Sequence, residues 1–179
     1  FHWDFGYWET RQRYTIENTR EALDTPGEWY YDRKAGRLYY YPFVGEEPDT
    51  IEAVIPALDH LVEFAGRPKD SAFIEHVTFQ SLGFQHARWR LGRREYQAFA
   101  QANDMLQHAA VICRGARNIS FLDCEVAHFG EHGLWFQEGC QNSVVRQCHI
   151  HDGGAAGVYI GEGGWKAAAS GPEDPNLLI

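Results

Sequence analysis

The sequence predicts an all-β chain whose main part is a parallel β-solenoid. Residues 116–163 hold two copies of one pattern offset by 24 positions, so that Asn118 matches Asn142 and Cys124 matches Cys148. Apolar residues within each copy stand two apart, which is the spacing of strands, and no window has the spacing of an amphipathic helix. Because one copy cannot bury its apolar residues alone, consecutive copies must stack about 4.8 Å apart with like residues in columns.

Each copy consists of three short apolar segments, which in the first copy are residues 119–121, 124–126 and 134–136. The alternation of inward-facing residues does not continue from the first segment into the second, which predicts a bend at Leu122–Asp123. Glycines bracket the turn before the third segment. A leucine-rich repeat can have a period in the twenties, but the leucine framework and the helical or turn half that it needs are not visible in this sequence.

The pattern is less regular in the first part of the chain. Two aromatic runs flank a glycine-containing turn in Trp29–Pro42, which predicts a β-hairpin. Arg20–Asp24 is consistent with one helical turn. Pro56 argues against a helix in the segment that follows the hairpin, so we expect two short strands there, around Ile51–Ile55 and Leu61–Phe64.

An earlier coil precedes the two copies. Residues 76–86 repeat the pattern, and an insertion with an arginine-rich start follows at 88–110. Val111 and Ile112 are expected to re-enter the solenoid as the last strand of that coil. We therefore expect three regions, which are a β-rich hairpin or accessory region at 1–70, β-helix coils at 71–163 with the loop insertion at 88–110, and a loop or truncated tail at 164–179.

The composition limits the function classes. A length of 179 residues suffices for one domain with a core, and the net charge of −9 argues against nucleic acids and anionic membranes as partners. No apolar run approaches the 18 residues of a membrane-spanning helix. The chain begins without Met and without the features of a signal peptide, so we expect a piece of a longer protein. The oligomeric state stays open.

The four cysteines, Cys113, Cys124, Cys140 and Cys148, are expected to be free thiols. Cys124 and Cys148 share one inward column, where strand neighbours rarely have the geometry of a disulfide. The Cys-x-x-Cys spacing of a zinc site does not occur in the sequence. No cofactor and no metal are therefore expected.

The order of these segments resembles a known family. GEWYYDRKAGRLYYYP at 27–42, HVTFQSLGFQHARW at 76–89 and the coils at 118–136 and 148–162 are similar to the right-handed parallel β-helix proteins related to glycoside hydrolase family 141. That family includes an α-L-fucosidase and a xylanase. The resemblance implies a small β-rich domain around the hairpin, packed on a right-handed β-helix of which about three coils are present. Further coils are expected outside this chain. Pectate lyases, alginate lyases and epimerases share the coil pattern.

Polar residues gather where the second strand of each coil ends. His86, His128 and Asp152 align at that position, and Trp135 and Tyr159 are expected to point outward nearby as an aromatic platform for a sugar ring. The candidate catalytic residues are Asp152, His128 and Glu162. Glu162 is included because the sequence around it resembles that of the family. The candidate substrate-binding residues are His86, Trp89, His132, Trp135, His151 and Tyr159.

Structural roles compete with each of these assignments. Asp152 precedes a glycine and can cap its own turn. His86 and His128 can be solvated strand ends, and Trp135 and Tyr159 can pack beneath the insertion. The sequence alone does not decide between the structural and the functional roles.

The resemblance, together with these residues, favours a glycoside hydrolase acting on plant or other complex polysaccharides. Such enzymes use two carboxyl groups, about 5–5.5 Å apart for retention and about 6.5–9.5 Å apart for inversion of the anomeric centre. No carboxylate shares the column of Asp152, and Glu131, Glu138 and Glu162 are the nearby candidates. The partner is therefore expected in coils that lie outside this chain.

Two other function classes stay open. A polysaccharide lyase or epimerase of this fold would use Ca²⁺ held by carboxylates together with a basic residue, and a β-helix face can also bind glycan without cleaving it. All three functions have an oligosaccharide or polysaccharide as partner. The parent protein is accordingly expected to be secreted or periplasmic.

Overall fold

The computed structural model describes residues 19–89 and 108–162, and the chain divides into two compact units, Phe1–Val54 and Ile55–Ile179. Almost every described element is a strand, which confirms the predicted all-β class. No helix among the described residues is long and apolar enough to cross a membrane. The elements of the first unit are η1 (Arg20–Ala22), β1 (Trp29–Asp32), β2 (Arg37–Tyr40) and η2 (Pro48–Thr50). The elements of the second unit are β3 (Val62–Ala65), η3 (Pro68–Asp70), β4 (Ile74–Glu75), β5 (Thr78–Gln80), β6 (Gly83–Gln85), β7 (Ala109–Arg114), β8 (Ala116–Arg117), β9 (Ser120–Leu122), β10 (Glu125–Phe129), β11 (His132–Phe136), β12 (Val144–Arg146), β13 (His149–Gly153) and β14 (Val158–Ile160).

The first unit contains the predicted hairpin. β1 and β2 pair antiparallel along their whole length. At the turn between them, the Asp32 carboxylate accepts hydrogen bonds from the backbone N–H groups of Lys34 and Ala35 at 2.9 and 3.0 Å. Gly36 adopts a φ of 62°, which glycine reaches without strain. The 3-10 turn η1 lies where a helical turn was expected, at Arg20–Asp24.

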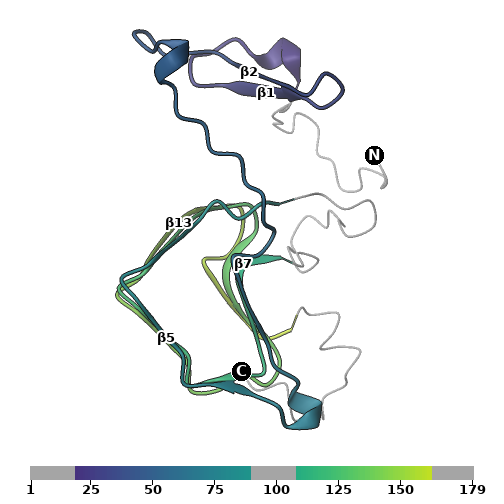
Figure 1. Ribbon diagram of the computed structural model, residues 1–179, viewed down its shortest axis with the longest axis vertical. Coiled ribbons are helices and arrows are strands. Elements are labelled where there is room, and N and C mark those ends of the chain that lie inside the picture. Colours follow the sequence, from purple (N-terminus) through teal and green to yellow (C-terminus); the bar gives the residue numbers. More distant parts are fainter. Residues whose placement is uncertain (1–18, 90–107, 163–179) are drawn as a thin grey trace, which may run out of the picture. The chain divides into compact units, whose positions relative to one another are not determined.

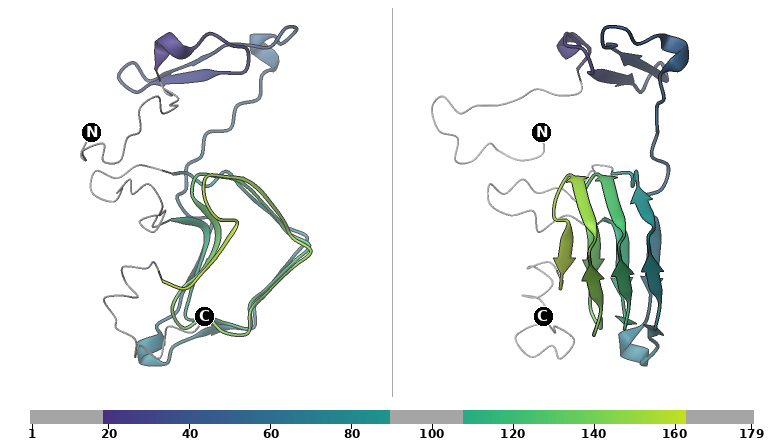
Figure 2. Two further views of the ribbon diagram at one scale, coloured as in Figure 1. Left: turned by 180° about the vertical axis from the view of Figure 1, so that it is seen from behind. Right: turned by 90° about the vertical axis from the view of Figure 1, so that its left-hand side faces the viewer.

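The second unit is a parallel β-helix, and β5, β7 and β13 mark three sides of its coil in Figure 1. Each side is a parallel sheet whose strands come from successive coils, as the right-hand view of Figure 2 shows. The strand orders of the three sheets are β13-β10-β6, β14-β11-β7-β3 and β12-β9-β5, and β4 and β8 form an additional two-stranded sheet.

The register of the coils agrees with the repeat of 24 residues. β9 and β12 place Phe121 beside Val145, and β10 and β13 place Val126 beside Ile150. The insertion is also followed by the expected strand, because β7 pairs with β11 and contains Val111 and Ile112. The pairings of β9 with β12 and of β10 with β13 match residues that the sequence aligned, so the repeat gives the correct register between these coils.

The corners of the coil are formed by residues with a left-handed backbone conformation. Asp123 has a φ of 53°, which confirms the bend predicted at Leu122–Asp123. Short polar residues and histidine tolerate this conformation better than most others. Three columns of such residues run along the β-helix, and they are His76, Asn118 and Asn142, then Ser81, Asp123 and Gln147, then His86, His128 and Asp152. The sequence pattern therefore specifies the corners as well as the strands.

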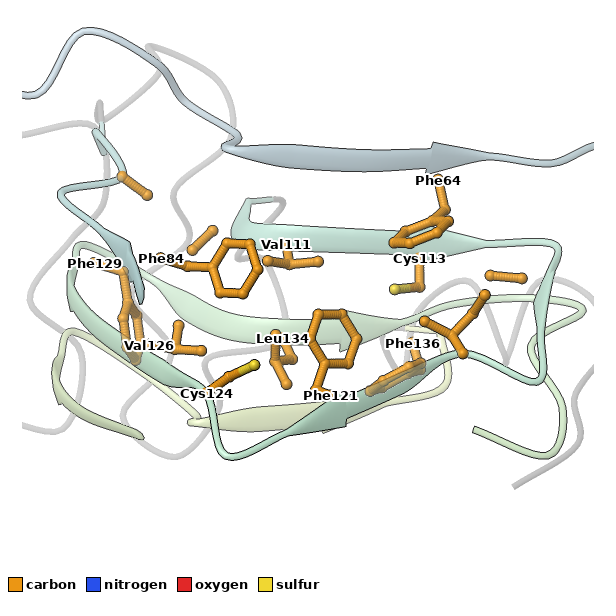
Figure 3. Close-up of a cluster of buried hydrophobic side chains, with 14 residues drawn as sticks. Phe64, Phe84, Val111, Cys113, Phe121, Cys124, Val126, Phe129, Leu134 and Phe136 are labelled. Atoms are coloured by element: carbon orange, nitrogen blue, oxygen red, sulfur yellow. The ribbon is translucent and has the colours of Figure 1, made fainter. Parts of the chain in front are cut away.

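Inward side chains of all three sheets fill the centre of the β-helix (Figure 3). Phe121 lies at the middle of this core and stacks on Phe79 with ring centroids 5.2 Å apart. All four cysteines are free, as predicted. Burial raises the pKa of the Cys113 thiol far above its ordinary value, so this thiol stays protonated and acts as a small apolar group.

Two glycines within strands differ sharply in the space around them, which gives a test of the coil spacing. A Cβ on Gly133 in β11 would lie 2.5 Å from the backbone oxygen of Gly157 on the next coil, whereas one on Gly83 in β6 meets nothing closer than 3.8 Å. Gly133→Ala is therefore expected to destabilise the fold by about 1–3 kcal/mol, and Gly83→Ala is expected to leave stability almost unchanged. Urea unfolding of both variants measures the difference, and equal midpoints would contradict the observed packing of the coils.

Two expectations about the first part of the chain differ from the structure. The strand expected at Leu61–Phe64 is present as β3, but no strand forms at Ile51–Ile55, where Val54 and Ile55 are exposed. Within the described residues no strand pairs with that segment, so its β-branched residues alone do not make it a strand. β3 itself pairs with β7, so the β-helix begins before residue 71, where the boundary was expected.

Candidate functional site

The candidate site lies on the outward face of the sheet formed by β6, β10 and β13. Because side chains alternate along a strand, the inward positions of Val126 and Ile150 turn their neighbours outward. Glu125 on β10 therefore lies beside His149 on the next coil, and His151 follows two residues later on the same face. Carboxylate and imidazole groups thus gather at one place on the surface.

His151 connects two carboxylates. Its Nδ1 lies 2.8 Å from Oδ2 of Asp152, and its Nε2 lies 3.2 Å from Oε1 of Glu125. The second oxygen of Glu125 accepts a hydrogen bond from the side-chain amide of Gln85 on β6. One imidazole ring therefore holds Glu125 and Asp152 apart at fixed positions on either side of it.

The charges of these groups support one another. The hydrogen bonds of His151 with Asp152 and then with Glu125 raise the pKa of His151 above its ordinary value. In turn, the hydrogen bond with His151 is the main cause that lowers the pKa of both Asp152 and Glu125. Asp152 is exposed to solvent and Glu125 and His151 are only partly buried, so the pairing is screened and contributes little to stability.

The row of corner residues that the sequence aligned is present beside this cluster. The rings of His86 and His128 stack with centroids 4.9 Å apart and planes inclined by only 9°. Nδ1 of His128 lies 3.9 Å from Oδ2 of Asp152 on the next coil. His86, His128, His151 and Asp152 therefore form one continuous polar edge, as expected from their positions in the repeat.

A second group of expected residues lies on the outward face of the sheet formed by β3, β7, β11 and β14. His132 stacks on Tyr159 at 4.6 Å, and the indole Nε1 of Trp135 donates a hydrogen bond to the backbone oxygen of Gly161 at 2.8 Å. Trp135 is only 2 % exposed, so the prediction of an exposed aromatic platform is wrong for this residue. Its outward direction is as expected, but Ala109 and Ile112 of this face are buried with it and pack against it.

The buried position of His132 fixes its protonation. The backbone N–H of Ala156 donates to Nδ1 of His132 at 3.3 Å, so Nδ1 is an acceptor and does not carry the ring proton. Burial lowers the pKa of His132, which also favours the neutral ring. His132 therefore holds the turn between two coils, and it does not belong to the polar edge at Asp152.

Trp89 and Glu131 connect the two borders of the insertion. The indole Nε1 of Trp89 donates to Oε1 of Glu131 at 2.7 Å, and the backbone N–H of His108 donates to the other carboxylate oxygen at 2.5 Å. Glu131 is buried by this arrangement. The rest of the predicted loop insertion, at 90–107, lies outside the described residues, and so do the residues expected as a tail at 164–179.

Glu162 binds a different group from those that contact Asp152. It follows β14 and accepts a hydrogen bond from the backbone N–H of Glu138 at 3.0 Å, whereas Asp152 precedes the turn that leads into β14. The carboxylate that shares His151 with Asp152 is Glu125, which the sequence reasoning missed together with His149. The repeat contained the signal, because Glu125 and His149 are 24 residues apart and both flank an inward residue of the second strand.

Comparisons with known proteins agree with this fold. The family model described as "Right handed beta helix region" matches residues 70–170, more than half of the chain. A solved structure titled "Glycoside hydrolase" is similar with a TM-score of 0.59 and 26 % sequence identity, and the match covers 75 % of this chain but 27 % of that chain. Among curated proteins no match was found. The coil register, the corner columns and the family match together show that the chain belongs to the right-handed β-helix family.

Proposed function

We propose that this chain is part of a carbohydrate-active β-helix protein, a glycoside hydrolase that resembles family 141. The observation that carries the proposal is the pair of carboxylates, Asp152 and Glu125, held on either side of His151. The likeness to a solved structure titled "Glycoside hydrolase" supports the same reaction class. Two carboxyl groups at a fixed separation are what glycosidic hydrolysis requires.

The separation of the pair favours an inverting reaction. The two N···O distances are 2.8 and 3.2 Å, so with about 2 Å across the ring the bridged oxygens approach about 8 Å apart when both hydrogen bonds are nearly straight, a spacing that suits the about 6.5–9.5 Å of inverting enzymes. In the proposed reaction the His151 ring turns out of the space between the two carboxyl groups, which also removes the hydrogen bonds that lower their pKa. One carboxyl group then protonates the leaving oxygen, and the other activates a water molecule on the opposite face of the sugar.

The polar edge beside the pair is the proposed sugar-binding surface. His86 and His128 stack along the β-helix axis next to Asp152, so their ring edges offer hydrogen-bonding nitrogens to the hydroxyl groups of an extended glycan. Consecutive coils repeat every about 4.8 Å, close to the rise of one sugar residue, which suits a polysaccharide chain lying along the edge. A polysaccharide substrate also implies a secreted or periplasmic protein.

A glycan panel tests this proposal. The full-length protein that contains this chain is incubated with plant and bacterial polysaccharides, and reducing sugar and absorbance of unsaturated product are measured in parallel. Hydrolysis releases reducing sugar without the unsaturated product. Unsaturated product would replace the proposal by a lyase, and glycan binding without either product would replace it by a binding protein.

A further inference from the structure

We propose that Glu125, His149 and His151 bind a divalent transition-metal ion, for which zinc is the best suited. One ligand atom of each side chain lies within 4.8 Å of those of the other two. This inference does not rest on the proposed hydrolysis, because it concerns binding alone.

The β-helix places these three ligands by its regular geometry. His149 and His151 are two residues apart on β13, so both imidazoles point outward, and their ring centroids are 4.1 Å apart. Glu125 lies on the neighbouring coil directly opposite His149. Ligands on paired strands are held by the backbone hydrogen bonds of the sheet, so little ordering is needed when a metal ion binds.

The distances fit a tetrahedral ion after a small adjustment. Nε2 of His151 and Oε1 of Glu125 are 3.2 Å apart. The ligand atoms of a tetrahedral zinc ion with bonds of about 2.0–2.1 Å are about 3.3 Å from one another, so this pair already has the required separation. His149 is exposed, so its side chain is free to turn and shorten the remaining separations from within 4.8 Å toward this value.

Neighbouring groups orient two of the three ligands, as they do in established metal sites. Asp152 lies 2.8 Å from Nδ1 of His151, so this nitrogen keeps its proton when a metal ion binds, and Nε2, once it has lost its own proton, directs its lone pair to the space beside Glu125. The amide of Gln85 holds the other oxygen of Glu125. A metal ion entering between Nε2 and Oε1 replaces any proton shared by those atoms, and that proton passes to solvent.

The ligand types select the ion. Two imidazoles and one carboxylate suit zinc and similar transition metals, whereas Ca²⁺ and Mg²⁺ need mainly oxygen ligands. Three protein ligands leave a fourth position for water, as in zinc sites with an open coordination position. Zinc at this place occupies Glu125, so it would inhibit a hydrolysis that uses this carboxylate.

Calorimetry on chelator-treated protein tests the site. We expect one zinc ion per chain, with a heat that depends on the buffer because a proton is released. Glu125→Gln and His149→Gln are expected to lower the affinity at least about tenfold, and Asp152→Asn about 10–100-fold. The control His76→Gln removes an exposed corner histidine outside the cluster, at a backbone conformation that Gln147 already adopts, and should leave zinc affinity unchanged.

Cobalt absorption separates this site from binding by cysteine. Co²⁺ in the proposed site gives the visible bands of a tetrahedral ion without a thiolate charge-transfer band, and circular dichroism verifies that each variant is folded. Absence of zinc binding, a thiolate band, or equal affinity in the wild type and Glu125→Gln would overturn the proposal. Because binding is read directly, these outcomes do not depend on whether the protein cleaves a glycan.

Discussion

Asp152→Asn is expected to lower the rate of glycan hydrolysis by about 10²–10⁴-fold, the usual contribution of a general acid or base. The substitution removes the charge and the exchangeable proton but keeps the shape. Asparagine also accepts the left-handed backbone that Asp152 adopts, because Asn118 and Asn142 adopt it at another corner of the same coils. Initial rates of reducing-sugar release at saturating substrate measure the effect, and Glu125→Gln should cause a loss of similar size.

Asp123→Asn is the matched control for this prediction. Asp123 is also an exposed corner aspartate with a left-handed φ, and it accepts a hydrogen bond from the Ser81 hydroxyl at 3.1 Å, which asparagine preserves. We expect it to keep full activity. If Asp152→Asn and Asp123→Asn had the same rate, the loss could not be attributed to catalysis and the assignment of Asp152 would be abandoned.

Phe121→Ala is expected to cost about 3–5 kcal/mol of unfolding free energy. Phe121 is fully buried and its ring contacts three other aromatic rings, stacking on Phe79 and meeting Phe84 and Phe136 edge to face at 6.1 and 6.3 Å. The three contacting rings come from three different strands, β5, β6 and β11, so the cavity left by the missing ring would be lined by elements of two coils and could not close easily.

Urea unfolding followed by circular dichroism measures this loss. Val144→Ala on β12 is the control, because Val144 is 44 % exposed on a strand that pairs directly with β9. It should change the free energy of unfolding by no more than about 0.5 kcal/mol. Equal stability of the two variants would show that Phe121 does not lie at the centre of the core.

The strand register and the corner residues could be predicted from the sequence because a solenoid repeats locally. An inward residue such as Val126 and its match Ile150 are neighbours in space for the same reason that they match in sequence. The same logic placed His86, His128 and Asp152 on one edge. The repeat gave no information about Ile51–Ile55, where the expected strand is absent, because that segment has no counterpart in the repeat.

The details of the candidate site depend on contacts between different columns, which the repeat does not encode. His151 connects Glu125 to Asp152. It lies on the next coil, two residues after His149, which is the residue that pairs with Glu125 in the sheet. Trp135 points outward as the pattern predicts, yet it is buried by neighbours on that face. The alternation of strand residues gives the direction of a side chain but not what covers it.

The anomeric configuration of the first product tests the central claim most directly. Proton NMR recorded immediately after the enzyme is added to a cleaved glycan distinguishes the two anomers before they interconvert. Because Asp152 and Glu125 bind opposite sides of the His151 ring and are proposed to have the wider spacing of an inverting pair, the product should have the inverted configuration. A product with retained configuration would contradict the proposal that these two carboxylates are the catalytic pair.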